Sequence, residues 1–199
     1  MEPWPPTVTL DGTHARLELT SQTHAADLAE ASADGDLHNL WYTTVPTSDE
    51  VPGEIDRRLG LREKGSMLPF TVIEKASGKA VGMTTFMNID ATNRRVEIGS
   101  TWYRKSVQRS PINTECKLML LRHAFEGLNC IAVELRTHYL NVQSRAAIER
   151  LGARLDGILR QHMIMANGTI RDTAVYSIPH YDWPSVKANL EFRLNRPRD

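Results

Sequence analysis

A strand, a long helix and a second strand follow one another directly in the middle of the chain, and this unit restricts the fold more than any other feature. Residues 94–103 alternate apolar with polar side chains, which predicts a strand. Residues 111–128 carry apolar side chains over a surface wide enough for a deeply packed helix. Residues 130–137 alternate again, with Ile131 predicted to point inward. Because the helix can carry the chain back across a sheet, the two strands are expected to be parallel.

The strands around this unit have the signals of antiparallel hairpins. Residues 70–75 and 80–89 flank a four-residue turn that contains Gly78. Residues 155–165 and 169–177 flank Ala166, Asn167 and Gly168, where the Asn-Gly dipeptide favours the tight turn of a hairpin. A strand–helix–strand unit within an antiparallel set predicts an α+β fold with a mixed, mostly antiparallel sheet.

Helix signals account for most of the remaining chain. Ser21 or Thr23 can cap a first helix, and Asn141 stands at the N-cap of a short helix that ends at Gly152. No repeat, low-complexity tract or linker divides the 199 residues, so we expect a single domain over residues 1–199. The other expected elements are an extended lead-in at residues 1–14, a strand at 15–20, helices ending near 33 and covering 48–63 and 141–151, and a C-terminal helix and tail at 184–199.

Composition excludes several classes of protein. Lys and Arg number 24, as do Asp and Glu, so no basic excess suggests a nucleic-acid partner. No apolar run approaches the length of a membrane span, and the first residues show neither the basic nor the apolar region of a signal peptide, so we expect a soluble, cytoplasmic protein. Cys116 and Cys130 are then expected to be reduced and buried. The seven histidines lack metal-ligand spacing, so no metal is expected.

The junction between the first strand and the helix of the central unit is the first candidate site. A helix N-terminus carries free backbone N–H groups and a partial positive charge, which suit a phosphate. Arg104, Lys105 and Arg109 precede the helix, Pro111 fits its first position and Ser110 is the expected cap. Taken alone, such a loop is more often a solvated connection with a good cap.

A second helix start lies where the other strand of the unit ends. Asn141 is followed closely by Ser144 and Arg145. If the two strands are neighbours, both helix N-termini open at one edge of the sheet, the edge at which parallel strands usually bind ligands. This arrangement suits a long ligand with a pyrophosphate at one end, although Asn141 alone is more simply an N-cap.

Five segments carry a combined signal: residues 96–103, 113–115, 141–153, 157–160 and 171–176. Taken in this order, they resemble the GNAT superfamily of N-acetyltransferases, in the branch of the ribosomal-protein N-terminal (Rim-type) acetyltransferases. The resemblance is good from about residue 70 to residue 178. It implies a GNAT-like sheet with helices on both faces, splayed around a cleft that binds acetyl-CoA as co-substrate.

The resemblance also implies roles for individual residues. Backbone groups near Trp102 and Tyr103 would pair with the pantetheine amides, and Asn141 and Arg145 would contact the cofactor further along. The pyrophosphate would lie on a loop formed by Gln108, Arg109, Ser110, Ile112, Asn113 and Thr114.

Two positions depart from the family pattern. Pro111 and Asn113 stand where the phosphate loop usually has glycine or another small residue, and Pro111 offers no N–H group. Ile148 stands where many relatives have a tyrosine that acts as general acid, and Ser144 fits the serine that the Rim-type branch often uses instead.

The reaction implied is direct attack of a neutral amine on the thioester, which needs a base for the amine and a partner for the departing thiolate. Glu97 is the expected base, with Glu134 in reserve, and Ser144 is the expected partner of the thiolate. Trp41 and Tyr42 are expected either to wall the acceptor site or to pack in the core.

Minor candidates have simpler interpretations. His138 and His162 are expected to be scattered or satisfied histidines rather than part of an acceptor pocket, and Arg171 and Asp172 to be solvated charges.

The function expected is transfer of an acetyl group to a primary amine of a small molecule or a peptide N-terminus. Two alternatives stay open: the same fold using another acyl-CoA such as succinyl-CoA, and a non-catalytic acyl-CoA-binding or regulatory module. A homodimer is a further possibility, with residues 186–194 contributing.

Overall fold

One eight-stranded sheet runs through the structure, a computed structural model that describes residues 4–196. The strand order is β1-β2-β3-β4-β5-β6-β8-β7, and every neighbouring pair is antiparallel except β5 and β6. The expected mixed, mostly antiparallel α+β sheet is thereby confirmed. The strands are β1 Leu10–Asp11, β2 Ala15–Leu19, β3 Met67–Glu74, β4 Ala80–Asp90, β5 Arg95–Tyr103, β6 Ala132–His138, β7 Arg154–Ile164 and β8 Ile170–Pro179.

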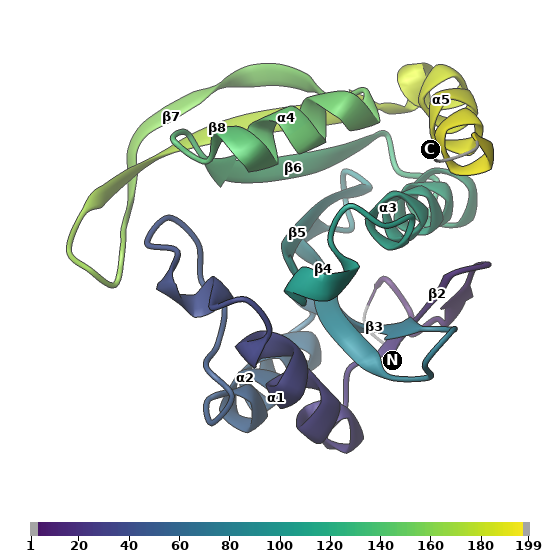
Figure 1. Ribbon diagram of the computed structural model, residues 1–199. Coiled ribbons are helices and arrows are strands. Elements are labelled where there is room, and N and C mark those ends of the chain that lie inside the picture. Colours follow the sequence, from purple (N-terminus) through teal and green to yellow (C-terminus); the bar gives the residue numbers. More distant parts are fainter. Residues whose placement is uncertain (1–3, 197–199) are drawn as a thin grey trace.

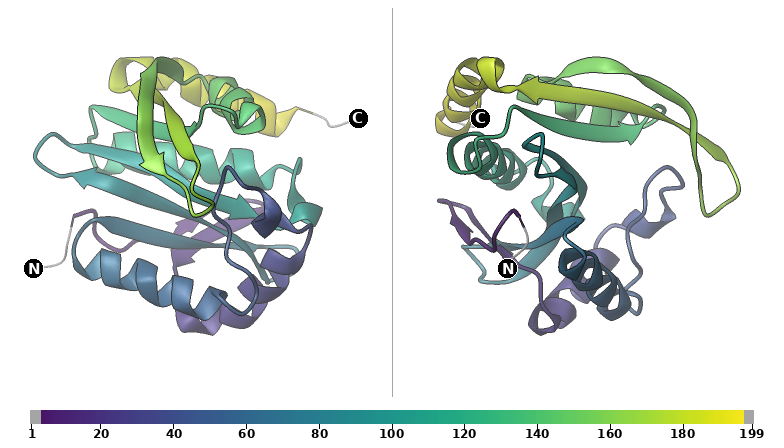
Figure 2. Two further views of the ribbon diagram at one scale, coloured as in Figure 1. Left: turned by 90° about the vertical axis from the view of Figure 1, so that its left-hand side faces the viewer. Right: turned by 180° about the vertical axis from the view of Figure 1, so that it is seen from behind.

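Helices cover both faces of this sheet. Figure 1 shows α1 and α2 on one side of the strands, and α3, α4 and α5 on the other. The two views of Figure 2 show the β7–β8 hairpin projecting past the rest of the sheet, above the segment that links α1 to α2. The α-helices are α1 Ala25–Ala33, α2 Val51–Glu63, α3 Ile112–Arg122, α4 Val142–Leu151 and α5 Trp183–Asn195. The short helices are η1 Gln22–His24, η2 Leu37–Asn39, η3 Lys105–Val107, η4 His123–Gly127 and η5 His180–Asp182.

The central helix differs from its expected form at both ends. Pro111 is the N-cap rather than the first helical residue, and Ser110 Oγ accepts a hydrogen bond from the N–H of Ile112 at 3.3 Å. At the other end the α-helix stops at Arg122 and continues as a π-helical turn over His123–Gly127. The expected helix over residues 111–128 is therefore present, but only its first part is α-helical.

The Asn-Gly dipeptide lies in a turn over residues 166–168, the three residues that the predicted strands flank. The N–H of Met165 donates to Thr169 O and that of Gly168 donates to Met165 O, both at 2.8 Å. Gly168 alone has a positive φ, of 80°, in this connection. The loop therefore has three residues with glycine in the left-handed position, because Asn167 does not adopt the left-handed conformation that a two-residue turn requires.

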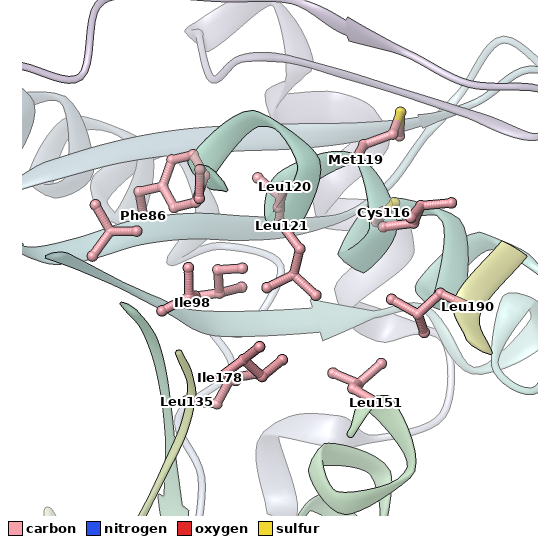
Figure 3. Close-up of a cluster of buried hydrophobic side chains, with 14 of the residues drawn as sticks. Phe86, Ile98, Cys116, Met119, Leu120, Leu121, Leu135, Leu151, Ile178 and Leu190 are labelled. Carbon is pink, nitrogen blue, oxygen red and sulfur yellow. The ribbon is translucent and has the colours of Figure 1, made fainter. Parts of the chain in front are cut away.

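The main hydrophobic core lies between the sheet and the three C-terminal α-helices. Figure 3 shows Leu121 of α3 pointing toward Ile98, Leu135 and Ile178, which come from β5, β6 and β8. A second, smaller cluster lies between α1, α2 and the other face, and it includes Trp102.

Three details of burial bear on the sequence expectations. Cys116 and Cys130 are free and buried, as expected, and burial raises the pKa of Cys116 to about 12 and that of Cys130 to about 11. Ile131 is exposed rather than inward because it lies just before β6 begins. Val186 and Leu190 pack inside this chain's own core, so they offer no surface to a second copy.

No helix within residues 4–196 combines the length and the apolar character that a membrane-spanning segment needs.

Glu115 joins the start of α3 to the beginning of the chain. Its buried carboxylate accepts hydrogen bonds from the backbone N–H groups of Thr13, His14 and Ala15, each at 2.8 Å. A carboxylate can accept all three bonds because it has only acceptor sites. The lead-in is thus anchored to the first turn of α3, immediately before β2 begins.

Replacing Glu115 with glutamine should therefore destabilise the fold strongly. The amide keeps one acceptor oxygen but turns an NH₂ group toward backbone donors, and the expected loss in the free energy of unfolding is about 2–3 kcal/mol. Urea denaturation measures this loss. Glu63→Gln, at an exposed position near the end of α2, is the control and should change stability by less than about 0.5 kcal/mol. Equal stability of the two variants would contradict the anchoring role of Glu115.

Candidate active site at the divergence of two parallel strands

The only parallel pair in the described sheet is short. β5 and β6 pair at Arg95–Ala132, Val96–Val133 and Glu97–Glu134, and no pairing between them follows. Beyond this point residues 98–103 of β5 and residues 135–138 of β6 run on without each other. We call this divergence the fork.

A bulge in β5 lies inside the fork and is held by α2. Ser100 has a positive φ of 47°, and the register between β4 and β5 shifts there. The guanidinium of Arg58, 2% exposed, donates to Ser100 O at 3.3 Å and to Thr85 Oγ1 at 2.8 Å. Glu54 accepts from Arg58 Nε at 2.7 Å one turn earlier in α2. A bulge re-aims the strand, and here a buried ion pair fixes it.

Glu97 lies at the base of the fork on the face toward α2. It is 5% exposed; Asn88 Nδ2 donates to its Oε2 at 2.7 Å, and Arg136 Nε lies 3.3 Å from the same oxygen. Burial raises the pKa of Glu97, and the partial compensation by Asn88 and Arg136 does not cancel this effect. A carboxylate with a raised pKa is a better proton acceptor than an ordinary one.

Glu134, the reserve candidate, is in a different state. Arg95 and Arg136 both donate to its carboxylate, at 2.5 and 2.7 Å. Burial raises the pKa of Glu134, but the hydrogen bonds from Arg95 and Arg136 outweigh it and the net pKa is lowered. Two guanidinium groups therefore hold Glu134 ionised, which makes it a weaker base than Glu97.

The charges around Glu97 were not expected from the sequence. Arg171 is partly buried rather than solvated: its Nε donates to Thr173 Oγ1 at 2.9 Å, and burial lowers its pKa despite attraction to Glu97. Asp172 accepts from the N–H of Gln161 at 2.8 Å, so it anchors β7. No spacing in the sequence indicates the proximity of Arg171 to Glu97 or the bond between Gln161 and Asp172, because each joins two different strands.

The segment between α1 and α2 reaches the end of β6. Trp41 is 46% exposed, and its ring lies edge-on to Tyr42 at 5.6 Å and to His138 at 5.1 Å between centroids. Trp41 and Tyr42 therefore do not pack in the core. They lie on the same face of the sheet as Glu97, as an acceptor wall requires.

His138 is buried, contrary to the expectation of a scattered surface or satisfied histidine. Its Nδ1 accepts from the N–H of Leu140 at 3.0 Å, which leaves the proton of the neutral ring on Nε2, and this atom has no partner among the described residues. Burial lowers the pKa of His138, so the neutral ring is favoured. His162 contacts Thr173 Oγ1 at 3.1 Å.

The loop before α3 holds fewer available cations than expected. Asp34, at the end of α1, accepts from Arg104 Nε at 2.9 Å, from Ser106 Oγ at 2.6 Å and from the N–H of Ser106 at 3.2 Å. Arg104 is thus engaged in an ion pair and is not available to a phosphate. Gln108 Nε2 donates back to Tyr103 O at 3.1 Å. Arg109 has a positive φ of 65°, which gives the loop a sharp turn there.

The first turn of α3 still offers backbone donors. The first intrahelical bond runs from the N–H of Glu115 to Pro111 O at 3.0 Å, so the N–H groups of Asn113 and Thr114 precede it. Asn113 and Thr114 also line a cavity of about 70 Å³ between α3, α4 and α5, together with Ala147, Arg150, Leu151, Leu190 and Arg193. Two guanidinium groups therefore border this helix start.

The start of α4 is well capped, as expected. Asn141 Oδ1 accepts from the N–H of Ser144 at 3.0 Å, and Gly152 closes the helix with a φ of 103°. The guanidinium of Arg145 donates to Tyr176 Oη at 2.9 Å and lies 4.6 Å from the ring centre of Tyr139. Ile148 is buried in the main core.

The remaining predicted residues are positioned to offer backbone groups rather than side chains. Trp102, Tyr103 and Ile112 are buried, with Trp102 in the α1–α2 cluster and the other two in the main core. Since β4 pairs with one edge of β5, the opposite edge of residues 98–103 faces the fork. Within residues 4–196, no three His, Cys, Asp or Glu side chains come together as a metal site would require.

Comparison with known proteins identifies the family. Residues 15–154 match the family described as "Acetyltransferase (GNAT) domain". The chain belongs to the GNAT acetyltransferases. A 110-residue stretch, 55% of this chain, is 33% identical to the Bacillus subtilis (strain 168) protein described as "Putative ribosomal N-acetyltransferase YdaF". This match spans 59% of the length of that curated relative.

Solved structures of the same fold cover nearly the whole chain. A GCN5-related N-acetyltransferase from Brucella melitensis is 34% identical, with a TM-score of 0.87 over 96% of this chain and 87% of the other. Mycobacterium smegmatis RimJ, solved in complex with CoA-disulfide, has a TM-score of 0.78 over 97% of both chains, and at 23% identity it supports the fold alone. The fork is therefore set in a GNAT fold.

Asn141 allows a test of the second helix start. Asn141→Ala should lower the free energy of unfolding by about 1 kcal/mol because it removes the cap, whereas Asn141→Ser should restore most of it. Thermal or urea denaturation measures both variants. If the alanine variant is as stable as the wild type, the hydrogen bond to Ser144 does not act as a cap.

Proposed function

We propose that this protein is an acetyl-CoA-dependent N-acetyltransferase that acetylates a primary amine. The observation that carries the proposal is the fork. Two parallel strands separate after three residue pairs, a helix N-terminus opens beside the end of each strand, and a buried carboxyl with a raised pKa lies at the base. Membership of the GNAT family supports acetyl-CoA as the acyl donor.

The residues of the first helix start fit a pyrophosphate, with one deficit. We infer that the N–H groups of Asn113 and Thr114, the guanidinium of Arg109 and the hydroxyl of Ser110 hold it. Pro111 supplies no N–H group, and Arg104 is already paired with Asp34. The loop therefore has fewer hydrogen-bond donors for a pyrophosphate than its number of polar residues suggests. Backbone groups of residues 98–103 would pair with the pantetheine amides along the open edge of β5.

The acceptor amine would enter from the opposite face. Trp41 and Tyr42 would border it, and Glu97 would take the proton from the attacking nitrogen. Asn88 and Arg136 orient the carboxyl of Glu97 without removing the effect of burial on its pKa. Ser144 would donate a hydrogen bond to the sulfur of the departing thiolate.

The acceptor class is a small-molecule amine or a peptide N-terminus. The Bacillus subtilis relative is described as a putative ribosomal N-acetyltransferase, and this description favours a peptide N-terminus as the acceptor. A screen of peptide N-termini, polyamines and aminoglycosides, with release of the CoA thiol as readout, identifies the class. Acetyl-CoA and succinyl-CoA are compared in the same screen, because another acyl group is an alternative donor.

A homodimer and a cytoplasmic location stay predictions. Val186 and Leu190 are buried within the chain, so on this helix the exposed Phe192 would have to make the dimer contact. Sedimentation equilibrium measures the oligomeric state.

Acetyl-CoA should bind and Arg109→Ala should weaken it about tenfold or more, because one charge-assisted bond to the pyrophosphate is lost. Calorimetry with CoA and with dephospho-CoA measures both affinities. Arg109→Ala should lower the affinity for CoA and for dephospho-CoA by the same factor, since the pyrophosphate is present in each ligand. Arg154→Ala, at an exposed position of β7, is the control and should leave both affinities unchanged.

Two outcomes would contradict this assignment. A loss that appears only with CoA would place Arg109 at the 3′-phosphate instead. Failure of the wild type to bind acetyl-CoA would overturn the proposed function, whereas binding without turnover on any amine would favour a non-catalytic acyl-CoA-binding module.

The rate of acetylation should rise with pH through the pKa of Glu97, because only its carboxylate form accepts the amine proton. Since burial raises this pKa, the rise of the rate on the acidic side of the pH–rate profile should have its midpoint above the pH at which glutamate usually titrates. We call this rise the acidic limb. Glu97→Gln should remove the limb and lower kcat/KM by about 100-fold or more.

An acceptor amine of different pKa provides the control for this profile. The limb due to Glu97 should stay in place while the limb due to the amine moves. A profile that follows the amine alone would show that Glu97 is not the base.

A further inference from the structure

Lys117 of α3 is a buried cation without an acidic partner. It is 7% exposed, and its Nζ donates to Thr101 Oγ1 at 3.0 Å. That hydroxyl is itself 2.8 Å from Thr84 Oγ1 and donates to Gly99 O at 3.3 Å. None of the ion pairs between described residues includes Lys117. An ammonium group has three donors, so one hydroxyl leaves it poorly satisfied.

Its place in α3 directs it toward the fork. Asn113, Lys117 and Leu121 are four residues apart and therefore lie on one stripe of the helix. Figure 3 shows Leu121 pointing toward Ile98 and Leu135, just past the last paired residues of β5 and β6. Asn113, at the other end of the stripe, lies at the helix start that faces α4. Lys117 lies between them, one helical turn before Leu121, the residue that fills the space next to the last paired residues of β5 and β6.

Thr101, the partner of Lys117, belongs to the open part of β5. It follows the bulge at Ser100 and lies beyond the last pair with β6. Its neighbour Trp102 packs with α1 and α2, so Thr101 points to the opposite face, toward α3.

Glu97 and Lys117 therefore approach the fork from opposite faces. A β-carbon on Gly99 would lie 2.9 Å from Glu97 Oε1, and Gly99 pairs with Thr85, whose hydroxyl accepts from Arg58 of α2. Glu97 thus lies on the face of α2, where the amine is proposed to enter. Lys117 lies on the face of α3 and α4, where Ser144 is proposed to meet the sulfur and where Ile148 provides no ionisable group.

A serine hydroxyl alone is an incomplete partner for a thiolate. It can donate a hydrogen bond, but it is a much weaker acid than a thiol and cannot supply the proton. An ammonium group provides both a positive charge and a proton. Such a group is present on the correct face of the fork.

We propose that Lys117 is a further catalytic residue, whose ammonium group stabilises and protonates the sulfur of the leaving CoA. This inference rests on the proposed function. As the C–N bond forms and the C–S bond breaks, the sulfur receives the electron pair of the C–S bond and then a proton from Nζ of Lys117. Glu97 receives one proton from the attacking amine, and exchange with water returns both groups to their starting states.

The surroundings of Lys117 suit this role. Burial lowers its pKa to about 8. A free thiol of the cysteine type has a pKa of about 8.5, so proton transfer to the thiolate is close to balanced. Nζ donates to the hydroxyl of Thr101, which in turn contacts that of Thr84. Burial raises the pKa of the adjacent Cys116 and of Tyr103, so both groups stay neutral.

The thiol of bound CoA reports directly on Lys117, and the measurement needs no acceptor. The complex with CoA is titrated with base while the ultraviolet absorbance of the thiolate is recorded. The complex with desulfo-CoA provides the reference spectrum. In Lys117→Met the pKa of the bound thiol should be higher than in the wild type by about one unit or more, because the neighbouring positive charge is lost.

Three variants separate charge from packing. Lys117→Arg keeps the positive charge and should retain a low thiol pKa, whereas Lys117→Gln keeps a donor to Thr101 without charge and should behave like Lys117→Met. Lys187→Met, on α5 beside Glu126, removes a distant lysine and should leave the thiol pKa unchanged. If Lys117→Met does not fold, the glutamine variant gives the same comparison.

The outcomes distinguish this inference from the proposed function. Equal thiol pKa values in the wild type and in the uncharged variants, with CoA bound to each, would overturn the role of Lys117 and leave the acetyltransferase proposal intact. Absence of CoA binding to the wild type would overturn both.

Discussion

The site depends on the early end of the pairing between β5 and β6. After three residue pairs the two strands separate, and three features keep them apart. The bulge at Ser100 turns β5, the guanidinium of Arg58 bonds to the carbonyl of that bulge, and Leu121 fills the space below with apolar volume. A parallel pair that continued to Tyr103 would satisfy its own backbone groups. The separated pair instead leaves one edge of β5 open to a ligand.

Burial affects the two ionisable groups of the fork in opposite directions. Taking a charge out of water disfavours the ionised form, so the pKa of Glu97 rises and that of Lys117 falls. Both shifts bring the groups toward neutral pH, where one can accept a proton and the other can release one.

Sequence patterns predict local structure here better than they predict the site. Alternation and turn residues located the strands, and Asn141 and Gly152 marked the ends of α4 because these signals act over a few residues. The surroundings of Glu97 depend on Arg136 and Arg171, which come from other strands. The sequence places Arg104 just before the phosphate loop, but its guanidinium donates to Asp34, 70 residues earlier in the chain. Lys117 carries no motif, and only its burial distinguishes it from a surface lysine.

The bond between Asp34 and the loop before α3 connects the two halves of the site. Asp34 ends α1, and the segment that carries Trp41 begins directly after it. Because Arg104 and Ser106 hold this aspartate, the loop before α3 and the start of the segment that carries Trp41 are fixed to one another across the sheet. If a ligand on one side displaces Asp34, any change that it causes in affinity on the other side must be reciprocal, because thermodynamic linkage makes the two factors equal. The order in which two such ligands arrive would then affect rates without altering the final equilibrium.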